Sequence, residues 1–198
     1  VEAGGLIRDR ALLELDRARA LLGEGKPFNA VNVFEAVDTM LKRADAAQVP
    51  HRWLILASAR LGGASDSYQV DQVGDAEAWS ASAQEAVVRA AASGDSDPRT
   101  VTELTIRADI AHVSAALRTS HAAETEERLR TLEARMESVE APSAGVLTEL
   151  AELAERLSAQ SLKTAVRQVA AHWVDRLVAL EDRLVLTEAR LEREMLRF

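Results

Sequence analysis

Residues 173–198 read WVDRLVALEDRLVLTEARLEREMLRF, and a seven-residue repeat runs through them. Apolar side chains recur at two positions of this repeat, as they do along the seam of a coiled coil. We therefore expect one helix here, and we expect its seam to pack against the same helix of a second chain. The seam residues are Trp173, Leu177, Leu180, Leu184 and Leu191.

Charged residues flank this seam in a regular order. Arg176 and Arg183 precede the leucines of the seam, and Glu181 and Glu188 follow five residues after each arginine. In a parallel pair of helices these two flanking positions face each other across the chains, so arginine meets glutamate. An antiparallel pair would bring arginine against arginine. The pattern predicts a parallel homodimer with ion pairs between the chains.

An alternative use of the same leucines stays open. Thr187 and Glu194 interrupt the apolar seam in its second half. In this alternative the leucines pack inside the chain's own helical bundle and form no dimer. The arginines then make ordinary surface ion pairs, which contribute little to stability.

The composition indicates an all-α protein. Of the 198 residues, 47% are hydrophobic and only 4% aromatic, so a core of leucine, valine and alanine is expected. Alanine and leucine are strong helix formers. The chain has no cysteine, which excludes disulfides, thiolate metal sites and cysteine nucleophiles.

The charge balance is acidic. Lysine and arginine number 24 against 32 aspartates and glutamates, for a net charge of −8. This balance disfavours general attraction to nucleic acid or to an anionic membrane. No apolar run approaches the length of a membrane span, and we expect a cytoplasmic protein. The preference for arginine over lysine, 21 to 3, is typical of a GC-rich bacterial genome.

Glycine and proline divide the first half of the chain into four predicted helices. Apolar periodicity predicts them over 6–22, 29–47, 51–61 and 76–92. Gly62-Gly63 is expected to end the third helix. Residues 62–75 are expected to form a loop, with a short extended piece at Tyr68-Gln69-Val70. The four helices would form an N-terminal domain over 5–93.

Within this domain, residues 11–44 resemble one tetratricopeptide repeat. The matching positions are Ala18, Leu21, Gly25, Ala30 and Phe34. Glu14 and Lys42 stand where that family has tryptophan and proline, and no second copy follows. Because such solenoids need several stacked repeats, the resemblance implies a tight antiparallel helix pair and no peptide-binding superhelix.

The second half of the chain is predicted to form a long-helix hairpin. Residues 99–141 and 146–198 contain no glycine or proline, and only residues 142–145 separate them. The simplest arrangement is an antiparallel hairpin with coiled-coil character over 99–198. The polar stretch 118–128 could interrupt the first helix. The arginine-leucine spacing of the C-terminal repeat recurs around Leu129 and Met136.

Motifs for catalysis are lacking. None of the four histidines lies in a metal-binding pair on a helix, and no phosphate-binding glycine loop is present. We therefore expect no enzyme, no cofactor and no metal. Phe34, Trp53 and Trp79 could line a small-molecule pocket, although large aromatic residues also fill cores that are rich in alanine.

The function expected from these features is that of a non-catalytic oligomerisation or adaptor protein. It would act through helix–helix association, with itself or with another protein. The alternatives are a dimeric, nucleic-acid-associated regulatory protein and a helical small-molecule sensor.

Overall fold

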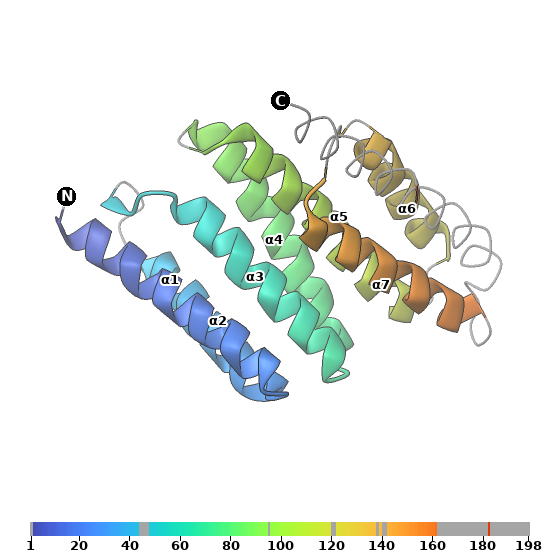
Figure 1. Ribbon diagram of the computed structural model, residues 1–198, viewed down its shortest axis with the longest axis horizontal. Coiled ribbons are helices and arrows are strands. Elements are labelled where there is room, and N and C mark those ends of the chain that lie inside the picture. The colour runs from blue at the N-terminus through green and yellow to red at the C-terminus, as the bar shows by residue number, and fades with distance from the viewer. Residues whose placement is uncertain are drawn as a thin grey trace, which may run out of the picture. The chain divides into compact units, whose positions relative to one another are not determined.

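The computed structural model describes residues 2–43, 48–94, 96–119, 122–137, 139, 142–161 and 182. These residues form seven α-helices and no strand, which confirms the all-α prediction (Figure 1). The chain divides into two compact units, residues 1–111 and 112–198, each described here by itself. The division falls inside one helix, so a domain boundary near residues 93–98 stays a prediction.

Helices α1 (Glu2–Gly23) and α2 (Pro27–Arg43) form the antiparallel pair that the repeat resemblance implied. The turn between them depends on Gly25, whose φ of 70° lies in the left-handed region that glycine adopts without strain. Pro27 begins α2, at the first helical position, where the backbone N–H that proline lacks would have no partner inside the helix. Ala18 and Ala30 are fully buried, which lets the two helices approach closely.

Helix α3 (Arg52–Gln69) packs against both α2 and α4 (Val73–Ser93). The prediction that Gly62-Gly63 ends this helix is wrong, because both glycines lie inside it. A Cβ on Gly62 would lie 2.3 Å from the ring of Phe34, and a Cβ on Gly63 would lie 2.8 Å from the ring of Trp79. The glycines therefore make room for two aromatic rings against the helix backbone.

The loop and extended piece predicted over residues 62–75 are also wrong. Helix α3 continues through Tyr68 and Gln69. It ends at Gln69, and Asp71, two residues beyond, has a φ of 65°. The amide of Gln72 donates to the carbonyl of Ser67 at 2.8 Å, which closes the last turn. Aspartate tolerates the left-handed conformation better than most residues, so this helix ends without a glycine.

Helix α4 ends at Gly94 (φ 70°), and α5 (Pro98–Thr119) begins with a side-chain cap. The carboxylate of Asp97 accepts hydrogen bonds from the amide and the hydroxyl of Thr100 at 3.0 and 2.9 Å. These bonds make Asp97 the N-cap of α5. The apolar core of the first unit includes the buried residues Leu15, Val37, Leu41, Leu56, Val87 and Leu104.

The second unit holds the end of α5 together with α6 (Ala122–Glu137) and α7 (Ala144–Ser161). Arg128 of α6 donates to the carbonyl of His112, and Arg156 of α7 donates to the hydroxyl of Ser114, so both helices are bonded to α5. The fully buried leucines of α6 and α7 are Leu129, Leu132, Leu150, Leu153 and Leu157.

Helix α5 ends and α6 begins within the polar stretch where the sequence allowed an interruption. Most of the second long helix, residues 162–181 and 183–198, lies outside the described residues. The long-helix hairpin therefore stays a prediction.

The packing of α3 predicts a cost for any side chain at Gly63. Gly63→Ala should lower the free energy of unfolding by about 1–3 kcal/mol, because the Trp79 ring must move aside and the core is overpacked. Urea unfolding followed by circular dichroism measures this change. Gly74→Ala is the control, since its Cβ would meet nothing within 4 Å; it should be neutral or slightly stabilising. Equal effects of the two substitutions would contradict the packing argument.

Candidate functional site

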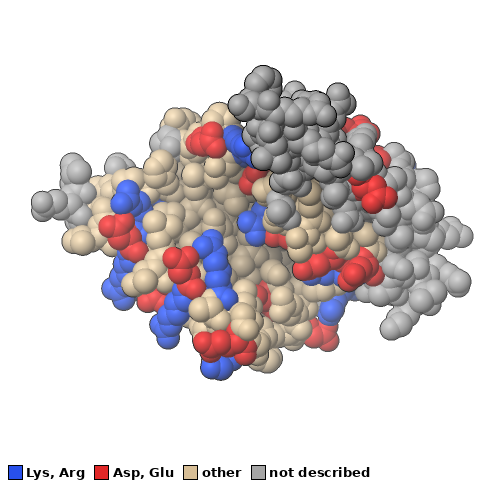
Figure 2. All heavy atoms as spheres, viewed as in Figure 1, with Lys and Arg blue, Asp and Glu red and all other residues tan. Residues whose placement is uncertain are grey.

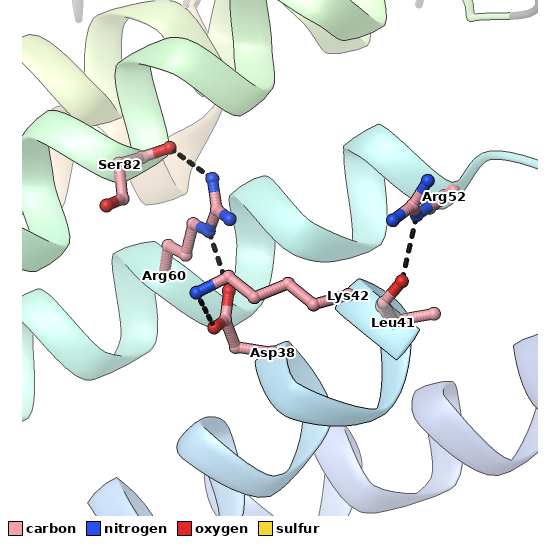
Figure 3. A network of polar contacts seen from close by, with 6 residues as sticks. All are labelled: Asp38, Leu41, Lys42, Arg52, Arg60 and Ser82. Atoms are coloured by element: carbon pink, nitrogen blue, oxygen red, sulfur yellow. Dashed lines mark hydrogen bonds and ion pairs between the residues drawn. The ribbon is translucent and has the colours of Figure 1, made fainter. Parts of the chain in front are cut away.

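A buried ion pair joins α2 to α3 in the first unit (Figure 3). The Nε of Arg60 donates to Oδ1 of Asp38 at 2.8 Å, and both side chains are 7% exposed. Charged groups are rarely buried this deeply unless they are paired, because removing them from water costs several kcal/mol each. The pair therefore needs further partners.

Two more groups complete this network. Nη1 of Arg60 donates to the carbonyl oxygen of Ser82 in α4 at 2.7 Å. Nζ of Lys42 lies 2.5 Å from Oδ2 of Asp38. Figure 3 shows Arg60 reaching between Asp38 and Ser82, so this one side chain links three helices. Nearby, Arg52 donates to the carbonyl of Leu41 at 2.9 Å, near the end of α2.

A hollow of about 290 Å³ adjoins the network. Trp79 forms part of its wall, beside Asp38, Lys42 and Arg60. The full set of ionisable residues around it is Glu35, Asp38, Lys42, Arg60 and Asp75. With three acidic and two basic groups, the hollow suits a small polar molecule and has no net attraction for an anion.

The three aromatic residues predicted to share a pocket occupy different surroundings. The ring of Phe34 lies on Gly62 and is 3% exposed, whereas Trp79 lies on Gly63 and borders the hollow. The ring of Trp53 is in contact with two guanidinium groups: its centroid lies 4.9 Å from Cζ of Arg52 and 4.7 Å from Cζ of Arg89. Both are cation–π contacts, and the one with Arg89 joins the start of α3 to α4.

Sequence reasoning did not single out Asp38 or Arg60. Each is an isolated charged residue in an amphipathic helix, and such residues are mostly exposed. The available signal was position, because Asp38 follows Phe34 by four residues and Arg60 precedes Gly63 by three. Asp38 therefore shares a face of α2 with Phe34, and Arg60 shares a face of α3 with Gly63, the residue that contacts Trp79.

Helix α1 carries apolar residues on its solvent side. Leu6 and Leu13 lie seven residues apart and are 71% and 70% exposed. The buried residues Ala11 and Ala18 lie on the other side of the helix. At this spacing the two leucines share one helix face, so a second helix could pack on it.

The predicted dimer seam, Trp173, Leu177, Leu180, Leu184 and Leu191, lies outside the described residues. The predicted interchain ion pairs of Arg176 with Glu181 and of Arg183 with Glu188 lie outside them as well.

Asp66, in the last turns of α3, is fully buried, and neither of its carboxyl oxygens has a hydrogen-bond partner. Burial disfavours the charged form and raises the pKa of Asp66 from 3.8 to about 7. The C-terminal end of a helix also carries partial negative charge, which is unfavourable for a carboxylate. Asp66 is therefore a destabilising group at neutral pH.

Over the described parts of the chain, no cluster of three or more histidine or acidic residues has the arrangement of a metal site. None of the described helices is long and apolar enough to cross a membrane. No protein-family model, curated protein or solved structure matches the chain.

The raised pKa of Asp66 predicts a pH dependence of stability. Between pH about 4 and about 7 the folded state binds more protons than the unfolded state, so the free energy of unfolding falls as pH rises. The loss should reach roughly 2–4 kcal/mol above pH 7. Asp66→Asn should remove it, so that the variant is more stable than the parent at pH 8 and similar to it at pH 4.

Asp97→Asn is the control for the pH dependence of stability that we expect from Asp66. Hydrogen bonds from Thr100 lower the pKa of Asp97, so its contribution has the opposite sign and is lost as pH falls below about 4. Urea unfolding from about pH 2 to pH 8 separates the two contributions. An unchanged pH profile in Asp66→Asn would contradict the burial argument.

The Asp38–Arg60 pair predicts a large effect of removing one partner. Arg60→Met should lower the free energy of unfolding by about 3 kcal/mol or more, because Asp38 then stays buried with Lys42 alone. Arg17→Met is the matched control: its ion pair with Glu14 is exposed and should contribute less than about 1 kcal/mol. Chemical denaturation measures both, and comparable losses would show that burial of the pair is unimportant.

Proposed function

We propose that the chain is a non-catalytic oligomerisation or adaptor protein that acts through helix–helix association. The observation that carries this proposal is the heptad repeat of residues 173–198, with arginine and glutamate at the flanking positions that face each other only in a parallel pair. The expected state is a homodimer.

In the proposed dimer, the leucines provide the affinity and the charged residues set the relative direction of the two helices. Burial of the Leu177, Leu184 and Leu191 side chains supplies the affinity, at about 1.5–3 kcal/mol for each fully buried leucine before the cost of association. The Arg–Glu pairs are exposed and add little affinity, but a reversed helix would place like charges together. The direction of pairing follows from that repulsion.

Two features of the described residues bear on where association takes place. In α6 the same heptad spacing occurs, but Leu129, Leu132 and Met136 are fully buried and unavailable to a partner. The proposal therefore rests on the C-terminal repeat. The exposed face of α1 around Leu6 and Leu13 offers a second apolar surface for another protein.

Other functions have weaker support. A nucleic-acid-associated role needs a basic surface, whereas basic and acidic side chains alternate over the described part of the face seen in Figure 2. A small-molecule sensor is favoured by one observation, the hollow beside Trp79.

The heptad predicts a charge-swap rescue. Arg183→Glu or Glu188→Arg alone should place like charges across the seam and weaken the dimer, and the double variant should restore it. Size exclusion with light scattering measures the mass over a dilution series at low salt, where exposed charges are least screened. Circular dichroism at the same concentrations checks that the helices remain.

The matched control is the Arg17→Glu and Glu14→Arg pair in α1, which makes the same charge changes on an exposed ion pair outside the heptad. It should leave the mass unchanged. A parent chain that is monomeric at all concentrations, or a double variant that fails to recover, would refute the proposed pairing.

A further inference from the structure

A second concave surface lies in the first unit, between α1, the start of α3 and the start of α5. It is a groove of about 340 Å³. Its floor is formed by Leu15, Ile55 and Leu104, which are 2%, 4% and 7% exposed. Leu12 and Leu54 form its apolar walls, and Leu12 is still 43% exposed. Apolar surface in this groove is thus accessible to a ligand.

The rim of the groove is basic. Arg8 and Arg19 belong to the same face of α1 as Leu12 and Leu15, and Arg107 comes from α5. The lining contains one acidic residue, Glu103. The hollow beside Trp79 has the opposite balance. Unlike that hollow, the groove combines an apolar floor with a lining that holds more basic than acidic side chains.

We propose that this groove binds a small amphiphile with an anionic head group, of the class of medium-chain carboxylates. The apolar chain would lie on the leucines and the carboxylate would meet the arginines, whose planar guanidinium groups accept a carboxylate with two hydrogen bonds. This inference is independent of self-association, because it uses none of the residues of the heptad repeat.

The size of the groove favours a small molecule over a protein segment. Ligand pockets have volumes of about 300–1,000 Å³, and this groove lies at the lower end of that range. A stable protein–protein interface buries about 1,200–2,000 Å² in total, which is more than such a groove offers.

Arg8 and Arg19 are paired with exposed carboxylates that a ligand can replace. Arg8 pairs with Asp9 at 2.7 Å, and Arg19 pairs with Asp16 at 2.8 Å. Asp9 and Asp16 are 62% and 71% exposed, so both pairs are surface ion pairs of small energy. Each carboxylate returns to water at little cost when a ligand takes the arginine.

The test is calorimetric titration of the 198-residue chain with decanoate, below the concentration at which decanoate forms micelles. Decanoate should bind at one site per chain. Leu12→Ser should weaken binding roughly tenfold through lost apolar contact, and Arg19→Gln by about threefold to tenfold. Decanol and decyltrimethylammonium should bind more weakly than decanoate, because neither carries a negative head group.

Neighbouring residues on α1 provide matched controls. Leu13→Ser removes an exposed leucine outside the groove, and Arg17→Gln removes an arginine that is 66% exposed, against 64% for Arg19. Both should leave decanoate affinity unchanged. Circular dichroism confirms that each variant is folded, and light scattering on the same samples reports association separately.

Three results would overturn the proposal. The first is no saturable decanoate binding by the folded parent protein. The second is equal weakening by the groove variants and their controls. The third is displacement of decanoate by an acidic amphipathic peptide that binds more tightly, which would make the groove a protein-docking site.

Discussion

The close approach of two aromatic rings to the backbone of α3 is the constraint on which the first unit depends. Phe34 reaches Gly62 from α2, and Trp79 reaches Gly63 from α4. Two adjacent residues without side chains therefore fix the position of α3 against both neighbours. In a core with few aromatic residues, these two rings fill space that alanine leaves open. The Asp38–Arg60 network lies on the helix faces that this packing brings together.

Buried polar groups in this unit fall into two kinds. Arg60 and Asp38 are paired and further bonded to Lys42 and Ser82, so their burial is compensated and specifies how three helices meet. The carboxyl oxygens of Asp66 have no such partners, and burial raises its pKa to about 7, so the group stays protonated in mildly acidic solution. A chain that tolerates such a carboxyl in its interior gives up stability at neutral pH, and its stability profile must respond to acid.

Apolar surface is used in three ways along this chain. In α6 and α7 the leucines are buried and hold the second unit together. In the groove beside Leu12 apolar surface lies under a basic rim, a combination that selects a ligand by both chain and head group. On α1, Leu6 and Leu13 remain exposed on a helix face that offers contact to another helix. The same residue type is thus buried in the second unit and left accessible in the groove and on α1, the two surfaces for which we propose contacts with other molecules.

Sequence alone determined the helical class, because that follows from composition and apolar periodicity, and the tetratricopeptide resemblance of residues 11–44 implied the tight pair of α1 and α2. The sequence also determined the heptad and its charge order, from which the proposed dimer derives. Only the tertiary structure decided the role of Gly62-Gly63, since a glycine that ends a helix and one that admits a ring look alike in sequence. The Asp38–Arg60 pair and the basic groove were also decided there, because each joins residues that are far apart in sequence and carry no local signal of their contact.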